Sequence, residues 1–277
     1  MYSTKAKFGV CYSIFLLLLF GAHAQDNLMV FPKRLVFQGG KDRVRNINIV
    51  NNGTGVSSYK ISFIELKMTP AGELVPIDGD HGETWMATPY FRVYPRSVTL
   101  NPGESQVVKV QLLNARTLSE GEYRSHLYFR NTSVPKADMG EASEKNTGDH
   151  ISVKLNYVFG ISIPTIIRTG RPNIKVDIKN VKMERAQGQP PVLSMDIERF
   201  GNISSYGNVV LEHIAPSGKV SVIHVQKGLA VYTPLHSRHV TFPLDEPGRA
   251  NLGKGQLKVT YEAAGNKVVY ASAVLDL

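Results

Sequence analysis

Two clusters of residues in this chain carry the side chains that metal chemistry needs. His236 and His239 are three residues apart, and Asp78, Asp80 and Glu83 form an acidic cluster. Two imidazoles at this spacing could converge on zinc in a helix, but the surrounding sequence predicts a loop and a strand, with no cysteine or carboxylate at ligand spacing. The acidic cluster lacks the full pattern of a calcium loop. We therefore expect surface histidines, a polar turn, and no bound metal or other cofactor.

Motifs for nucleophilic or phosphate chemistry are also missing. The sequence contains no Gly-x-Ser-x-Gly turn, no phosphate-binding glycine loop and no dinucleotide fingerprint. The single cysteine, Cys11, lies in the amino-terminal leader described next, so the mature chain would have neither thiol chemistry nor a disulfide. Carboxylates distant in sequence can still meet in space, which leaves an enzyme of unrecognised type as an alternative. Our prediction is a protein that is not an enzyme and has no catalytic residues.

Residues 1–24 predict a secretory signal. Lys5 and Lys7 precede the apolar run 8–20, and Ala22 and Ala24 give a small-x-small cleavage pattern. The run is short for a membrane span, so we expect cleavage near Ala24 and an exported chain without stable membrane insertion; an uncleaved anchor is the alternative. The formal net charge of +9 falls by two without these lysines, and the other charges are scattered. Nucleic acid is therefore a poor candidate for a partner.

The mature sequence predicts an all-β protein of two immunoglobulin-like sandwiches. Strand-like alternation and turn signals recur at short intervals, and no long window keeps a helical period. Residues 135–149 predict a flexible connection, and residues 169–172 predict a domain boundary. We expect an amino-terminal domain over 25–168 and a carboxyl-terminal domain over 169–277. The predicted strands lie at 46–49, 58–63, 108–112, 123–129, 174–178, 192–197, 209–214, 220–225, 240–242, 257–261 and 268–274.

The longest alternating stretch precedes Pro164 and follows the predicted flexible connection. A long apolar strand beside a flexible segment is a place where another chain can pair. An ordinary core strand is the alternative, more so for residues 159–163 than for 151–155. One face of this stretch carries the odd-numbered residues Ile151, Val153, Leu155, Tyr157, Phe159, Ile161 and Ile163.

Four segments in order resemble the periplasmic pilus-assembly chaperones. Residues 94–112 look like that family's pattern of Pro, an apolar pair, Pro-Gly and an alternating strand, and residues 121–129 follow where it places its sixth strand. Residues 34–37 resemble its first strand, and residues 161–167 its exit towards the second domain. The resemblance covers about residues 27–170. It implies two immunoglobulin-like domains in an L shape and a location in the periplasm.

The resemblance also implies a function and two partners. Chaperones of this family lend their seventh strand to a pilus or fibre subunit whose immunoglobulin fold lacks a strand, and deliver it to an outer-membrane usher; strand addition of this kind is general. The inserting residues here would be Ile151, Val153, Leu155 and Tyr157. The alternative function is a secreted structural or adhesive surface protein built of immunoglobulin-like modules.

The family anchors the subunit's terminal carboxylate with an arginine of the first strand and a lysine of the seventh. Arg34 matches the arginine, and a guanidinium suits a carboxylate; an ordinary solvated arginine is the alternative. The lysine is not matched, because the corresponding position falls on Phe159 or Gly160. Lys154 is the only cation on this strand and lies earlier, so a clamp of Lys154 and Arg34 would need a differently placed carboxylate.

Overall fold

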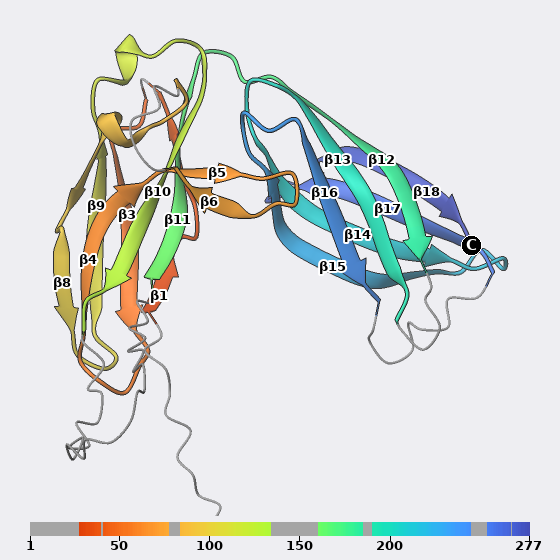
Figure 1. Ribbon diagram of the computed structural model, residues 1–277, viewed down its shortest axis with the longest axis horizontal. Helices are drawn as coiled ribbons and strands as arrows, with labels where there is room; N and C mark the ends of the chain where they lie inside the picture. The colour runs from red at the N-terminus through yellow and green to blue at the C-terminus, as the bar shows by residue number, and fades with distance from the viewer. Residues whose placement is uncertain are drawn as a thin grey trace, which may run out of the picture.

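The computed structural model describes residues 28–39, 41–77, 84–133, 160–184, 190–244, 254–266 and 268–277. This part of the chain folds into two β-sandwiches that lie at an angle to each other (Figure 1). The predicted all-β class with two immunoglobulin-like sandwiches in an L-shaped arrangement is confirmed. Within the described residues, no helix is long and apolar enough to cross a membrane.

The first sandwich packs a four-stranded sheet on a five-stranded sheet. The strand orders are β1-β3-β9-β7 and β2-β11-β10-β4-β8, and among these described strands only the β2–β11 pair is parallel. The strands are β1 (Leu28–Phe31), β2 (Leu35–Gln38), β3 (Val44–Asn51), β4 (Ser57–Ile64), β7 (Phe91–Tyr94), β8 (Ser97–Leu100), β9 (Ser105–Leu112), β10 (Gly121–Asn131) and β11 (Gly160–Thr169).

The second sandwich begins after a short connection that follows β11. Its sheets have the orders β12-β13-β16 and β15-β14-β17-β18, all antiparallel. In the described residues after β11 there are seven strands, as many as the alternation predicted. They are β12 (Ile174–Glu184), β13 (Val192–Gly201), β14 (Ser205–Ile214), β15 (Val220–Val231), β16 (Ser237–Pro243), β17 (Gln256–Ala263) and β18 (Val269–Asp276).

Period-two patterning explains both cores. Every second side chain of a strand points to the same face, so alternation places one apolar set inside each sandwich. Ile47 and Ile49 of β3 are fully buried, as are Leu193 and Ile197 of β13. Each sandwich therefore has its own buried cluster.

A third, smaller cluster joins the sandwiches. The hairpin of β5 (Leu66–Met68) and β6 (Leu74–Pro76) extends from the first sandwich to the second (Figure 1). Met68 packs with Ile166 of β11 and with Tyr232, which follows β15. At the hairpin tip the carbonyl of Pro70 accepts a hydrogen bond from the backbone N–H of His239, at 2.7 Å. The outer face of the five-stranded sheet is thus covered by the second sandwich at one end.

The strand β11 differs from the sequence prediction at its end. We expected Pro164 to follow the strand, but β11 continues through Pro164 to Thr169. The pairing with β2 starts only at Thr165, so Pro164 lies where one side of β11 has no described neighbour. A proline is tolerated at such an edge position because it has no N–H to donate.

Candidate strand-binding site

The first sandwich has an open position where its amino-terminal chain changes sheet. β1 pairs with β3, the chain crosses over at residues 32–34, and β2 pairs with β11 from Leu35 opposite Thr165. Within the described chain, residues 160–164 of β11 are paired only with β10. A strand segment paired on one side presents backbone groups to which another strand can bind.

A groove of about 700 Å³ lies between β1 and this open segment of β11. Leu28, Val30 and Ile163 line it and also belong to the buried core of the first sandwich. An added strand could therefore pair with β11 and pack alternate apolar side chains against core residues. The rest of the lining consists of Met29, Lys33, Asn52, Ile161 and Ser162.

Arg34 lies at the crossover, directly before β2, and faces the second sandwich. Its guanidinium carbon lies 4.5 Å from the centroid of the Tyr206 ring and 5.6 Å from that of Tyr232. Its Nη1 atom is buried and has no hydrogen-bond acceptor among the described residues. The two rings restrain the guanidinium beside the crossover.

Two further cationic or ionisable groups of β10 lie in the same interface. The guanidinium carbon of Arg124 is 4.3 Å from the Tyr232 ring centroid and 5.3 Å from that of Trp85. Burial lowers the pKa of Arg124 to about 10. Burial, with the charges of Arg124 and Arg34, lowers the pKa of His126 to about 3, so this imidazole is neutral at ordinary pH.

A buried carboxylate ties the sandwiches together beside this cluster. Glu122 of β10 accepts a hydrogen bond from Nε of Arg168 at 2.9 Å and one from the backbone N–H of Ser204 at 3.0 Å. The hydroxyl of Ser204 also donates to it, and that hydroxyl accepts from the backbone N–H of Thr233 at 3.0 Å. Glu122 thus links β10 and β11 to two loops of the second sandwich.

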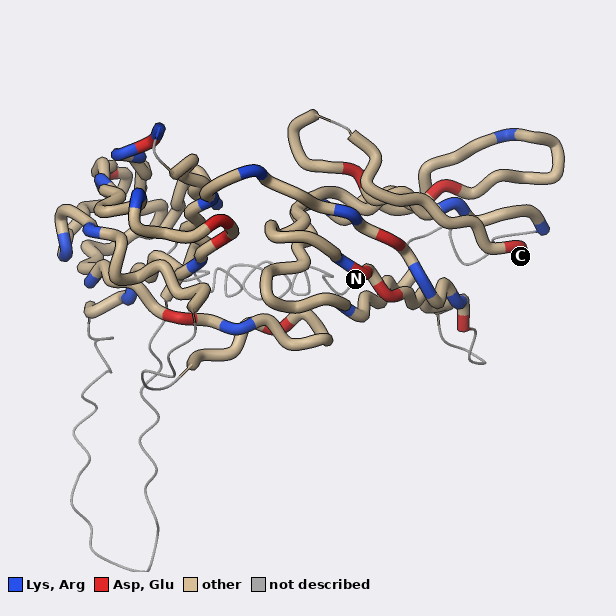
Figure 2. Tube along the Cα trace, turned by 90° about the horizontal axis from the view of Figure 1, so that it is seen from above, with Lys and Arg blue, Asp and Glu red and all other residues tan. Residues whose placement is uncertain are grey.

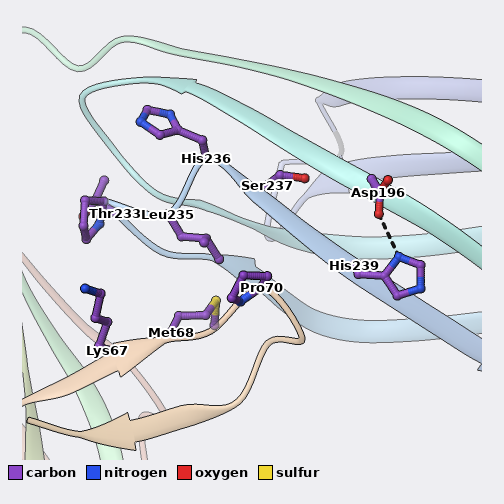
Figure 3. A pocket seen from close by; sticks show the side chains of 10 residues that line it. Lys67, Met68, Pro70, Asp196, Thr233, Leu235, His236, Ser237 and His239 are labelled. Carbon is purple, nitrogen blue, oxygen red and sulfur yellow. Dashed lines mark hydrogen bonds and ion pairs between the residues drawn. The ribbon is translucent and has the colours of Figure 1, made fainter.

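A second hollow, of about 530 Å³, lies between the β5–β6 hairpin and the second sandwich (Figure 3). Its clearest polar contact joins Nδ1 of His239 to Oδ1 of Asp196 at 2.7 Å. No group of three metal-ligating side chains occurs among the described residues. His236 lies in a loop and His239 in β16, both exposed, as the sequence predicted.

Of the six residues proposed from the sequence as subunit-binding residues, the structure describes one, Arg34. Ile151, Val153, Lys154, Leu155 and Tyr157 lie outside the described residues, as do Phe159 and the acidic cluster of 78–83. Arg34 is described, and it lies at the sheet crossover rather than within the first strand. Arg34 directly precedes Leu35, the first β2 residue that pairs with β11, and Pro164 of β11 pairs with His126 of β10.

The buried cluster on β10 was missed. Glu122, Arg124 and His126 alternate with Tyr123 and Leu127, which is the pattern of a strand with one solvated face. The signal available was three ionisable residues at a spacing of two. The second sandwich helps to bury them, together with Trp85 beside Arg124 and Arg168 beside Glu122, and its contact involves loops that sequence periodicity does not position.

Lys and Arg positions are spread along the chain trace of both sandwiches, with Asp and Glu positions between them (Figure 2). Along the described part of the trace, the Lys and Arg positions do not gather in a single stripe of the kind that follows a nucleic-acid backbone. This distribution agrees with the scattered charges of the sequence.

Comparisons with known proteins give structural likenesses only. No family model matches the chain, and no curated protein matches it. The solved structures similar to it include the class 5 fimbriae chaperone CfaA, at 14% identity and a TM-score of 0.38, covering 90% of this chain and 98% of that one. The E. coli chaperone DraB shares 14% identity at a TM-score of 0.40, covering 91% and 97%.

A third similar structure is the CsuC–CsuE complex of a chaperone and a tip adhesion subunit from archaic chaperone-usher Csu pili of Acinetobacter baumannii. It shares 10% identity at a TM-score of 0.41, covering 90% of this chain and 97% of that one. These descriptions name the same class of protein that the sequence resembles.

Proposed function

We propose that this chain is a periplasmic chaperone that caps an incomplete immunoglobulin-like pilus or fibre subunit by strand complementation. The observation that carries the proposal is the half-paired segment of β11 at residues 160–164, beside a groove that reaches the core. A subunit that lacks a strand has unpaired backbone groups and exposed apolar surface, which promote aggregation. Pairing with this edge satisfies those groups.

The strand that enters the subunit is the segment preceding β11. Ile151, Val153, Leu155 and Tyr157 continue the alternation of Ile161 and Ile163 along one face. Burial of a large apolar side chain contributes about 1.5–3 kcal/mol, so three of them contribute several kcal/mol before the cost of ordering the segment. Affinity would therefore depend on this face of the segment.

The subunit's terminal carboxylate is held at the crossover by Arg34. Its restrained guanidinium supports this role, because a guanidinium binds a carboxylate through charge-assisted hydrogen bonds. Lys154 would contribute only if the carboxylate lay further from the second sandwich. The second partner is an outer-membrane usher that receives the subunit. The basic leader followed by an apolar run supports export, with cleavage near Ala24.

The test is recovery of a subunit with Leu155→Glu, with Ser152→Glu as the matched control. Both variants introduce the same charge, but Ser152 belongs to the other face of the predicted strand. Wild type and Ser152→Glu should co-purify with a small β-rich subunit at about one to one, and Leu155→Glu should not. Equal recovery by all three proteins would contradict strand donation through this segment.

A further inference from the structure

Lys33 is a charged side chain at the strand-binding groove that the proposed function leaves without a role. It is exposed and lines the groove between β1 and β11. It forms no ion pair with a described carboxylate. A lysine beside core residues at an open strand edge can form an ion pair with a negatively charged group of a bound ligand.

The open segment of β11 supplies no cation to this groove. Residues 160–164 read Gly-Ile-Ser-Ile-Pro and include no charged side chain. The next cation along β11 is Arg168, which is bound to the buried carboxylate of Glu122. Of the residues that line the groove in the described chain, Lys33 alone is charged.

The position of Lys33 defines which end of an added strand it meets. The groove follows β1 to the crossover at residues 32–34, and beyond this β2 occupies the edge of β11. An added strand must therefore end at the crossover, where consecutive residues Lys33 and Arg34 supply two positive charges. A positively charged end favours a free carboxylate, so the bound strand would end there with its carboxyl terminus and run parallel to β11, as β2 does.

We propose that Lys33 is the second cation of the carboxylate site and that it selects a strand with a free carboxyl terminus. This inference rests on the proposed function, because it assumes that a strand binds in the groove. Arg34 is restrained by Tyr206 and Tyr232 and supplies a directed donor. Lys33, on a flexible stem without such stacking, adds a point charge from the groove side.

The experiment compares two forms of one peptide against the mature chain. The probe is an N-acetylated nine-residue peptide of alternating valine and threonine, prepared with a free carboxylate or with a carboxyl-terminal amide. Binding is followed by NMR shifts of the amides of Ile161, Ser162 and Ile163, which report occupancy of the groove. A charge-assisted hydrogen bond is expected to make the acid bind about tenfold or more tightly than the amide to the wild type.

Lys33→Gln should bind the amide as the wild type does and lose most of the preference for the acid. Lys109→Gln, which removes a lysine from the other sheet, should keep the full preference. If Lys33→Gln retains the wild-type preference while both peptides shift the groove amides, the role of Lys33 is wrong and strand binding stands. If neither peptide shifts these amides in the wild type, the proposed function and the role of Lys33 fail together.

Discussion

Replacing His126 by phenylalanine should remove a pH-dependent loss of stability. His126 is buried, and both ring nitrogens lack hydrogen-bond partners among the described residues. Its ring lies edge-on to Tyr232 with centroids 6.3 Å apart, a contact that phenylalanine can keep. The substitution thus removes a titratable group without removing a described hydrogen bond.

The sign and size of the effect follow from the pKa of His126. Burial first, then the charges of Arg124 and Arg34, lower this pKa from 6.5 to about 3 in the folded protein. Between these values the unfolded chain binds one more proton than the folded chain, so stability falls as the pH is lowered below 6.5. At pH 5.0 the loss is about 1.5 pH units at about 1.4 kcal/mol each, or about 2 kcal/mol.

The assay is urea unfolding at pH 7.5 and pH 5.0, followed by the fluorescence of the single tryptophan. Trp85 lies against Arg124 in the same interface, so its emission reports this region. The drop in unfolding free energy between the two pH values should be about 2 kcal/mol smaller for His126→Phe than for the wild type. His236→Gln, which removes an exposed histidine, should keep the wild-type drop. An equal drop in His126→Phe would refute the buried neutral imidazole.

Three further predictions concern the contacts between and within the sandwiches. Glu122→Ala leaves Arg168 without its buried partner, so it should lower the unfolding free energy measured in urea by about 3–5 kcal/mol. A change below about 1 kcal/mol would contradict the buried ion pair. The pKa of Asp196 is lowered, chiefly by the hydrogen bond from Asn180, so its stabilisation is present above about pH 4 and lost as the pH falls further. Asn180→Ala should raise that pKa towards 3.8, which an NMR titration of the carboxyl carbon would detect, and an unchanged midpoint would exclude this cause. Gly72→Val should lower the unfolding free energy by about 1–3 kcal/mol, because φ at this position is +86° and an added Cβ would lie 2.1 Å from the guanidinium of Arg238 in the second sandwich. Thermal or urea unfolding measures this change, and wild-type stability would show that the hairpin does not pack against Arg238.

The strands could be predicted because a two-residue apolar period is a local property of the sequence. Ile47 with Ile49 and Val108 with Val110 lie inside the first sandwich as their alternation required. The extent of β11 was misjudged, because Pro164 looked like the end of a strand. Whether a proline is tolerated depends on the neighbour of that strand position, which is a tertiary property.

The candidate site was only partly predictable for the same reason. Arg34 was proposed through a resemblance, but its contacts with Tyr206 and Tyr232 join residues 172 and 198 positions apart. The alternation of Glu122, Arg124 and His126 predicts a solvated strand face, and the second sandwich buries it. Local alternation predicts the face of the strand on which a side chain lies, whereas the packing of the two sandwiches determines which residues it contacts.

Hydrogen–deuterium exchange at residues 160–164 tests most directly whether the edge of β11 receives another chain. These residues have one described neighbouring strand, β10, so part of their backbone should exchange faster than the doubly paired segment 165–168 in the free protein. Purified with a bound subunit, the chain should show slowed exchange at Ile161–Ile163. Unchanged exchange there, with protection appearing on another surface, would contradict the account.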